Sequence, residues 1–401
     1  MQGSLKNNKK LSQIECVLPE RATFWDYTSE LAANELKYMK PQIIAFYLPQ
    51  YYPFKENDEW WGKGFTEWTN VGKAKPLFKG HNQPRVPTEL GYYDLRLPEV
   101  REQQAELARE AGVTAFCYWH YWFGNGKRLL ERVFDEVLES GKPDFPFCLG
   151  WANHSWYAKT WDINSQKSDK LLIEQTYPGL DDAKMHFDFL VKAFKDPRYI
   201  KIDGKPLFFI FRPKDLPESY INYFQKRAIA EGFPGILFVA QLTASDNKEF
   251  FIKLGYDLFV VQRLGAFMER QKFKGQTRLL RYIRIIKGLF QNRPPFCYDY
   301  ANSLDLFVTD EELANDVLPS IVPQWDHTPR SGWNGSLYIN ATPKLFYKQV
   351  KKALNVIKDK PDDRKIIFLK SWNEWGEGNF MEPDLTYGRG FCEALRKALD
   401  E

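Results

Sequence analysis

The fold class of this chain is decided by one segment near its C-terminus, Ile366-Ile367-Phe368-Leu369-Lys370-Ser371-Trp372-Asn373-Glu374-Trp375-Gly376-Glu377-Gly378. Its first four residues form a short apolar run of the kind that becomes a buried strand, and the two glycines mark the turn that leaves it. Two carboxylates, Glu374 and Glu377, stand among tryptophans directly after the run. In a (β/α)8 barrel the catalytic groups lie at the C-terminal ends of the strands. The segment therefore predicts a barrel strand that carries an acid–base pair.

Apolar runs of strand length alternate with helical patterns along the rest of the chain, which favours a parallel sheet covered by helices. The predicted strands are Ile43–Leu48, Val113–Trp119, Phe145–Trp151, Leu207–Phe211, Ile236–Ala240, Leu258–Val261, Ser320–Gln324 and Ile366–Lys370. The predicted helices between them are Leu97–Ala111, Leu129–Ser140, Asp181–Phe194, Glu218–Glu231, Lys248–Leu254 and Leu345–Lys358. Eight strands with intervening helices predict an α/β fold, a (β/α)8 TIM barrel with long βα loops and a single catalytic domain.

The domain organisation follows from where this alternation begins. Residues 1–40 are predicted to form an N-terminal extension with a helical segment near Phe24–Lys37, and residues 41–401 the barrel. The segment from Pro49 to Pro98 is far longer than the typical connection of about 4–6 residues. A loop of that length is usually functional, so we expect it to cover the active site.

Composition and charge exclude several classes of function. The net charge of +4, from 56 basic and 52 acidic side chains, is too balanced to indicate a nucleic-acid-binding protein. The five cysteines lack CxxC spacing and there is no H-E-x-x-H motif, so neither a disulfide framework nor a metal site is predicted. No Gly-rich phosphate loop indicates a nucleotide, and we expect no cofactor.

The N-terminal sequence and the lack of long apolar stretches predict the cellular location of the protein. Residues 1–11 are basic but no apolar run follows them, so a secretory signal is not expected. No stretch approaches the roughly 18 apolar residues that span a membrane. These features predict a cytoplasmic, soluble protein.

A basic amphipathic segment at 270–293 qualifies that prediction. Its lysines and arginines stand among leucines and isoleucines, and residues 270–293 include no acidic residue. Such a segment can lie on an anionic membrane surface, which would suit an enzyme that acts on lipid-linked glycans at the inner membrane. The alternative is an ordinary barrel helix with a solvated basic face.

The paired carboxylates are the strongest catalytic signal. Two neighbouring carboxyl groups can separate their pKa values, so that one remains protonated as an acid while the other is ionised as a base, which is what cleavage of a glycosidic bond requires. The alternative, solvated loop acids, is the commoner state of a Glu-x-x-Glu pair, but the strand and the tryptophans around Glu374 and Glu377 favour a site. Glu382 could add a further carboxylate from the same loop.

Aromatic residues make up 16% of the chain and gather with polar residues at the predicted strand ends. Three tryptophans, Trp60, Trp61 and Trp68, stand among acids and glycines in the first long loop. Flat rings stack on the C–H faces of sugars while neighbouring polar groups bind hydroxyls, so these clusters predict a glycan site. Packing of a structural lid is the alternative reading for each ring.

The chain resembles the WbsX-like proteins of bacterial polysaccharide biosynthesis, which are related to glycoside hydrolase family 99, the endo-α-mannosidase family. The resemblance runs from about Lys40 to Asp400. It rests on the motifs FYLPQY at 46–51, NDEWWGKGFTEWTNV at 57–71, WDHTPR at 325–330 and WNEWGEG at 372–378.

The resemblance implies a catalytic mechanism. In the hydrolase relatives the first carboxylate of the pair is proposed to deprotonate the sugar 2-hydroxyl, giving a 1,2-anhydro intermediate, and the second to protonate the leaving oxygen. Carried over, Glu374 would be the base and Glu377 the acid/base. This chain has Gly376 where those hydrolases often have His.

The motifs and the resemblance together give a set of expected functions and residues. The expected partner is an oligosaccharide or a lipid-linked glycan of O-antigen, lipopolysaccharide or capsule metabolism, and no nucleic acid. Two alternatives remain open, a glycosyltransferase with an activated sugar donor and a non-catalytic glycan-binding barrel. The residues predicted to bind substrate are Tyr47, Trp60, Trp61, Glu67, Trp68, His120, Tyr121, Trp122, Asn153, Trp156, Gln324, Trp325, Asp326, Asn373, Trp375 and Glu382.

Overall fold

A computed structural model describes residues 41–158, 170–264, 286, 293–294 and 296–401. The predicted N-terminal extension at 1–40 lies outside the described residues, as does nearly all of the basic segment at 270–293.

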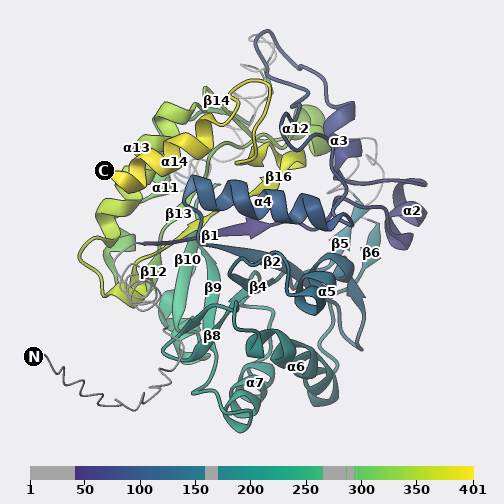
Figure 1. Cartoon of the computed structure of the whole chain (residues 1–401), viewed down its shortest axis with the longest axis vertical. Helices are drawn as coiled ribbons and strands as arrows, with labels where there is room; N and C mark the ends of the chain where they lie inside the picture. Colours follow the sequence, from purple (N-terminus) through teal and green to yellow (C-terminus); the bar gives the residue numbers. More distant parts are fainter. Residues whose placement is uncertain (1–40, 159–169, 265–285, 287–292, 295) are drawn as a thin grey trace, which may run out of the picture. The chain divides into compact units, whose positions relative to one another are not determined.

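The predicted barrel is confirmed (Figure 1). Its strands are β1 Gln42–Tyr47, β2 Ala115–Trp122, β4 Phe147–Trp151, β8 Lys205–Ile210, β9 Leu237–Thr243, β10 Leu258–Gln262, β12 Val317–Leu318, β13 Ser320–Ile321 and β15 Ile366–Leu369. Each predicted strand overlaps one of these, and the seventh, Ser320–Gln324, overlaps only the two-residue β13, which pairs with β15. The strand β12, which pairs with β10, was not predicted; Pro319 separates it from β13. All the pairings around the ring are parallel. Strands β12 and β13 thus connect the two ends of the sheet, and the C-terminal strand ends meet at one mouth.

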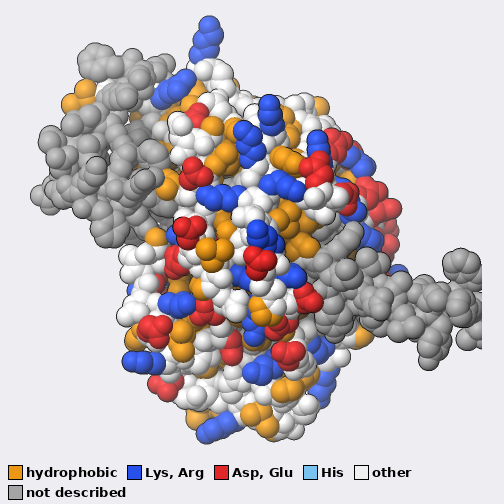
Figure 2. All heavy atoms as spheres, turned by 90° about the vertical axis from the view of Figure 1, so that its left-hand side faces the viewer, with side chains coloured by type: hydrophobic (Ala, Val, Ile, Leu, Met, Phe, Trp, Pro, Cys, Tyr) orange, Lys and Arg blue, Asp and Glu red, His pale blue; other side chains and the backbone are white. Residues whose placement is uncertain are grey.

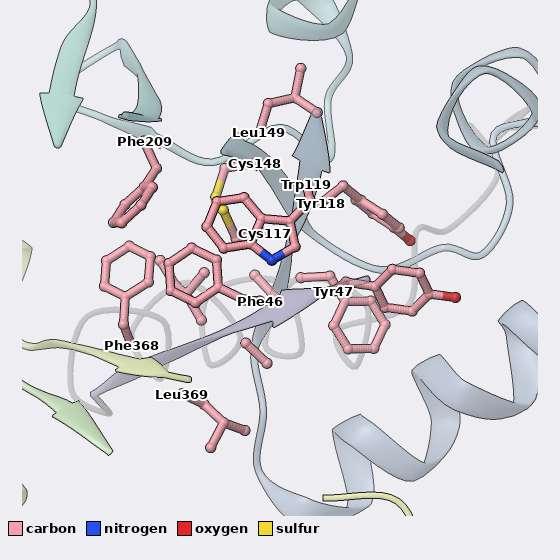
Figure 3. Close-up of a cluster of buried hydrophobic side chains, with 14 of the residues drawn as sticks. Phe46, Tyr47, Cys117, Tyr118, Trp119, Cys148, Leu149, Phe209, Phe368 and Leu369 are labelled. Atoms are coloured by element: carbon pink, nitrogen blue, oxygen red, sulfur yellow. The ribbon is translucent and has the colours of Figure 1, made fainter. Parts of the chain in front are cut away.

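Aromatic side chains fill the barrel interior (Figure 3). Phe46 stacks on Trp119 with ring centres 4.6 Å apart, and it also contacts Phe209 at 4.8 Å and Phe368 at 5.3 Å. Tyr47, the next residue along β1, points to the opposite side of the strand, because successive side chains of a strand face opposite ways. This aromatic cluster fills the barrel interior below the mouth.

Helices follow the strands and bury their apolar faces against the sheet. They are α4 Pro98–Ala111, α5 Glu131–Ser140, α6 Leu180–Lys195, α7 Glu218–Ala230, α8 Lys248–Lys253, α13 Pro343–Ile357 and α14 Gly390–Asp400. Six of them match predicted helices, whereas α14 was not predicted. In Figure 1, α14 lies beside α13, and its contacts with α4 cover the part of the sheet around β1.

Shorter elements lie in the long loops. The remaining strands are β3 Arg128–Leu129, β5 Trp156–Tyr157, β6 Leu171–Ile173, β7 Lys201–Ile202, β11 Cys297–Asp299, β14 Leu337–Ile339, β16 Asn373–Glu374 and β17 Asn379–Phe380. The remaining α-helices are α2 Lys55–Trp61, α3 Glu67–Lys73, α11 Leu304–Phe307 and α12 Thr328–Ser331, and the 3-10 helices are η2 Ala301–Ser303, η3 Asp310–Leu313, η4 Gly332–Asn334, η5 Asp362–Arg364 and η6 Trp375–Glu377. The loop at 49–98 therefore contains the two short helices α2 and α3.

The surface seen in Figure 2 carries basic and acidic side chains in close mixture, with apolar side chains scattered among them. No helix within the described ranges is both long enough and apolar enough to cross a membrane.

Candidate active site at the barrel mouth

The Glu374–Glu377 pair lies on a small hairpin that follows β15. Strand β16 pairs with β17, and η6 forms the turn between them. Asn373 fixes this hairpin to the end of β1: its side chain accepts a hydrogen bond from Leu48 N at 2.8 Å and donates one to Leu48 O at 3.0 Å. Asn373 is fully buried, so its place is structural support directly beneath Glu374.

The far side of the turn is held by the loop after β13. Asp326 N donates to Glu377 O at 2.7 Å. Gly378 ends the turn with φ +53°, and a Cβ at this position would lie 2.8 Å from Asp326 Cβ. Glycine is required here by both the backbone conformation and the close approach. The positions of both carboxylates are thereby determined by contacts from two other strand ends.

One buried arginine binds three carboxylates in the site. Arg330, on α12, donates from Nε to Glu67 Oε1 at 3.0 Å and from Nη1 to Glu377 Oε1 at 2.5 Å. Its distance to Glu374 Oε1 is longer, 3.5 Å. Arg330 is 2% exposed and Glu67 is fully buried. A buried charge requires such pairing, because an ion removed from water without a partner is strongly disfavoured.

The two acids of the pair have different surroundings. Burial of Glu374, together with the neighbouring charge of Glu377, raises the pKa of the Glu374 carboxyl to about 8, although Arg330 and Lys370 act in the opposite direction. Glu374 therefore holds a proton at neutral pH, while Glu377 accepts the short hydrogen bond from Arg330. A carboxyl group that holds its proton at neutral pH is what a general acid requires.

Glycine 376 makes room for the third carboxylate. A Cβ built on Gly376 would lie 1.5 Å from Glu67 Oε1 and 3.2 Å from Arg330 Nε. No side chain fits between these groups, so the Glu67–Arg330 pair depends on glycine at this position. The structure thus gives a steric reason for glycine where the resembling hydrolases often have histidine.

His327 lies next to the pair. Its Nε2 is 3.6 Å from Glu377 Oε1, and its Nδ1 is 2.8 Å from Ser331 Oγ. Burial and the charge of Arg330 lower the pKa of His327 to about 4, so the ring is uncharged at neutral pH. It contributes a neutral polar contact to Glu377 rather than an ion pair.

A pocket of about 290 Å³ opens above the aromatic interior, and both Glu374 and Glu377 line it. Residues in or after eight of the nine ring strands line it, namely β1, β2, β4, β8, β9, β10, β13 and β15. The lining residues are Leu48, Trp119, Tyr121, Ala152, His154, Trp156, Phe211, Gln241, Gln262, Leu264, Trp325, Arg330, Lys370, Glu374 and Glu377. Aromatic walls combined with a few polar groups are typical of a small-molecule or glycan site.

Five residues that the sequence singled out line this pocket: Glu374, Glu377, Tyr121, Trp156 and Trp325. Tyr121 and Trp156 meet edge to face with ring centres 5.2 Å apart. Trp325 stacks near His327 and donates its indole N–H to Ser336 Oγ at 3.0 Å.

Another group of predicted substrate-binding residues forms a buried network behind the hairpin. Glu382 accepts hydrogen bonds from Trp375 Nε1 at 2.6 Å, Gln104 Nε2 at 2.6 Å and Tyr93 OH at 2.9 Å. Tyr47 donates to Gln104 at 2.6 Å. Burial raises the pKa of Glu382 to about 7, against the effect of its hydrogen-bond donors. Tyr47, Trp375 and Glu382 do not line the pocket but hold the hairpin from behind.

The three loop tryptophans, which the sequence predicts to belong to a glycan site, have different neighbours in the structure. Trp68 packs against Trp375 at 5.5 Å and donates its indole N–H to Tyr93 O at 2.7 Å. Trp60 meets the pocket residue Trp156 at 6.0 Å, whereas Trp61 contacts Phe65. None of the three belongs to the pocket lining.

The remaining predicted residues lie away from the pocket. His120 Nε2 bonds His186 Nε2 at 2.8 Å, and Trp122 donates to Asp182 at 3.1 Å, both between β2 and α6. Asn153 donates to Tyr177 and Arg212, Gln324 to Phe380 O at 3.4 Å, and Asp326 accepts from His81, Gln83 and Thr328. The structure places these side chains in supporting contacts.

Several pocket residues were not predicted: Arg330, Lys370, His154, Gln241 and Gln262. Arg330 and Lys370 lie within or beside the motifs already quoted, so their position next to acids and tryptophans was the available signal. Gln241 and Gln262 carry no such signal, since each is one polar residue near the end of an apolar strand. Within the described part of the chain, no group of three or more His, Cys, Asp or Glu side chains could hold a metal ion.

Comparison with known proteins agrees with the fold and the motifs. The family model for Glycosyltransferase WbsX matches residues 43–395. The WxcX proteins from two strains of Xanthomonas campestris pv. campestris are each 33% identical over 367 residues, which cover 89% of this chain and 49% of the relative. The chain thus spans about half the length of these curated relatives.

Solved structures resemble the fold at low sequence identity. A glycoside hydrolase-like protein superposes with a TM-score of 0.54 at 14% identity, covering 90% of this chain and 94% of the other. The GH99 endo-α-mannosidase from Bacteroides thetaiotaomicron superposes with a TM-score of 0.52 at 16% identity, covering 90% and 96%. Since the family model spans nearly all of the barrel, the chain belongs to the Glycosyltransferase WbsX family.

Proposed function

We propose that this chain makes or breaks a glycosidic bond in bacterial surface-polysaccharide metabolism, with Glu374 and Glu377 as the proton-transferring pair. The observation that carries this proposal is the pocket at the barrel mouth, where one acid has a raised pKa and the other accepts a hydrogen bond from Arg330. The substrate would be an oligosaccharide or a lipid-linked glycan of O-antigen or capsule, handled in the cytoplasm or at the inner membrane.

The proposed reaction proceeds in two steps through a 1,2-anhydro sugar. In the first step the base removes the proton of the sugar 2-hydroxyl, O2 attacks the anomeric carbon, and the bond to the leaving oxygen breaks as the acid protonates that oxygen. In the second step water or an acceptor hydroxyl opens the three-membered ring, giving its proton to the former acid, while O2 recovers its proton from the former base. Water gives hydrolysis and an acceptor gives transfer.

The surroundings of the two acids support an order of roles that differs from the one implied by the resemblance. Glu374 has the raised pKa and therefore carries the proton in the free enzyme. Glu377 accepts from Arg330 and is the better candidate for the base. We therefore give the acid role to Glu374 and the base role to Glu377.

The experiment that tests the function is incubation of the chain with defined oligosaccharides, with and without candidate acceptors and nucleotide sugars, and identification of the products by mass. Glu374→Gln and Glu377→Gln are the matched variants. With an activated aryl leaving group, loss of the acid matters little, whereas loss of the base still abolishes turnover. Activity of Glu377→Gln, but not of Glu374→Gln, on the aryl substrate would reverse the assignment.

Two further outcomes would count against the proposal. If both variants bind glycans and wild type never turns any over, the chain is a non-catalytic glycan-binding barrel. If an activated 2-fluoro sugar leaves a covalent adduct on either glutamate, the reaction uses a carboxylate nucleophile instead of O2.

A further inference from the structure

Lys370 presents a buried cation to the pocket. It follows β15, and its backbone N donates to Ile321 O at 2.9 Å, so the parallel pairing continues through it. Because side chains alternate along a strand, Lys370 faces the same way as Phe368, into the barrel interior. Its ammonium lies 6.0 Å from the ring centre of Phe46, and the residue, which lines the pocket, is 8% exposed.

This ammonium has no hydrogen-bond or ion-pair partner among the residues that the structure describes. Among residues 41–158, 170–264 and 296–401, no hydrogen-bond acceptor and no carboxylate lies within bonding distance of Lys370 Nζ, whereas Arg330 in the same pocket binds three carboxylates. An ammonium has three donors, and Lys370 lines the pocket, where a ligand can accept from them.

Glu374, which lines the same pocket, does not neutralise the positive charge of Lys370. Glu374 has a pKa of about 8 in the free enzyme, since burial outweighs the neighbouring cations, and it is therefore largely neutral at neutral pH. Glu377 and Glu67 are bound to Arg330. The pocket consequently contains one cation whose charge no described carboxylate contacts.

The neighbours of Lys370 suit a sugar ring. Trp119 and Phe211 line the same pocket and meet edge to face at 5.6 Å, which gives an apolar wall for stacking. Gln241 and Gln262 add amide groups from β9 and β10. A cation beside an aromatic wall and two amides can bind a sugar that carries a negative charge.

We propose that Lys370 binds an anionic group of the substrate, so that the pocket selects a sugar bearing a carboxylate or a phosphoryl ester over its neutral counterpart. This inference rests on the proposed function for the location of the sugar, but not on the occurrence of turnover. A carboxylate would come from a uronic acid unit of the polysaccharide, and a phosphoryl group from an activated donor.

The test is a binding titration in which ligand-observed NMR measures the affinity of each probe. The probes are glucuronate, galacturonate and mannuronate, the three neutral hexoses of the same configuration, and the corresponding hexose 1-phosphates. Wild type is expected to bind at least one anionic probe about tenfold or more tightly than its neutral counterpart, the range expected for a charge-assisted hydrogen bond. Selectivity for the uronates indicates a uronic acid substrate, and selectivity for the phosphates indicates an activated donor.

The variants separate a ligand role from a structural one. Lys370→Gln should bring the ratio of anionic to neutral binding close to one, and Lys370→Arg should retain most of it. Lys253→Gln, the same change at an exposed position on α8, should leave the ratio unchanged. Since the readout is a ratio within one variant, partial unfolding cannot imitate the result.

Three outcomes would overturn the inference: equal binding of anionic and neutral probes by wild type, binding of neither class, or selectivity that survives Lys370→Gln. A Lys370→Gln variant that shifts only the pH profile of turnover, with an unchanged ratio, would also overturn it, because Lys370 would then act only on Glu374. Selective binding without any turnover would refute the proposed function and leave the role of Lys370 standing.

Discussion

The most direct test of the site geometry is Gly376→Ala. The new Cβ would lie 1.5 Å from Glu67 Oε1, far inside any allowed contact, so the Glu67 carboxylate must move away from Arg330. Glu67 is fully buried on α3 and its partner atom, Arg330 Nε, is 3.0 Å away. The substitution therefore adds overpacking and removes a buried charge-assisted hydrogen bond.

The expected magnitude follows from these two effects. Overpacking of a tight site costs about 1–3 kcal/mol, and loss of a hydrogen bond to a charged group about 1.5–3 kcal/mol. The free energy of unfolding should thus fall by about 2.5–6 kcal/mol in total. Turnover should fall as well, since Arg330 also positions Glu377.

Urea unfolding followed by tryptophan fluorescence measures the change. Gly72→Ala is the matched control, because a Cβ at this position in α3 meets nothing within 4 Å. Combining Gly376→Ala with Glu67→Ala removes the clash, so the double variant should lose less stability than the sum of the two single losses. A Gly376→Ala protein as stable as Gly72→Ala, or strictly additive losses, would refute the steric dependence of Glu67 on Gly376.

Further predictions concern the acids and the tryptophans. Glu377→Gln should abolish turnover on substrates with poor and with activated leaving groups while preserving the circular dichroism spectrum, and near-wild-type rates would remove Glu377 from the mechanism. The raised pKa of Glu374 gives stability that is present below its ordinary pKa of 4.5 and is lost as the pH rises through about 8. Glu374→Gln, which imitates the neutral form, should therefore gain stability relative to wild type as the pH of urea titrations rises over this window; a difference that does not vary with pH would contradict the assignment. Trp68→Ala should cost about 3–5 kcal/mol because its ring packs behind the hairpin. Trp60→Ala should instead weaken glycan binding measured by titration more than it lowers the melting temperature, and the opposite ranking of the two variants would place Trp60 in the core.

Of the three residues of β2 predicted to bind substrate, only Tyr121 lines the pocket, and the reason is geometric. His120, Tyr121 and Trp122 are adjacent and equally rich in functional groups, but a strand turns successive side chains to opposite faces. Tyr121 reaches the pocket together with Trp119, while His120 and Trp122 turn toward α6. The cluster was visible in the sequence, whereas the face of each side chain depended on the register of the barrel.

What the sequence by itself determined is the barrel and the strand end that carries the acids. Short apolar runs bounded by breakers can only be buried, and their alternation with helical patterns leaves few arrangements other than a parallel ring. The ends of the strands then had to meet, which brought Glu374 and Glu377 together with Tyr121, Trp156 and Trp325. These conclusions need only local periodicity and the rule for where parallel strands end.

The tertiary structure alone decided how the acids are held and what stands beside them. Arg330 reaches Glu67 across 263 residues of chain, and the space for that contact exists only because position 376 lacks a side chain. Burial set the raised pKa of Glu374, and the position of Lys370 in the pocket was settled only when every strand end was in place. Such properties arise from contacts between distant segments, and no local pattern of residues encodes them.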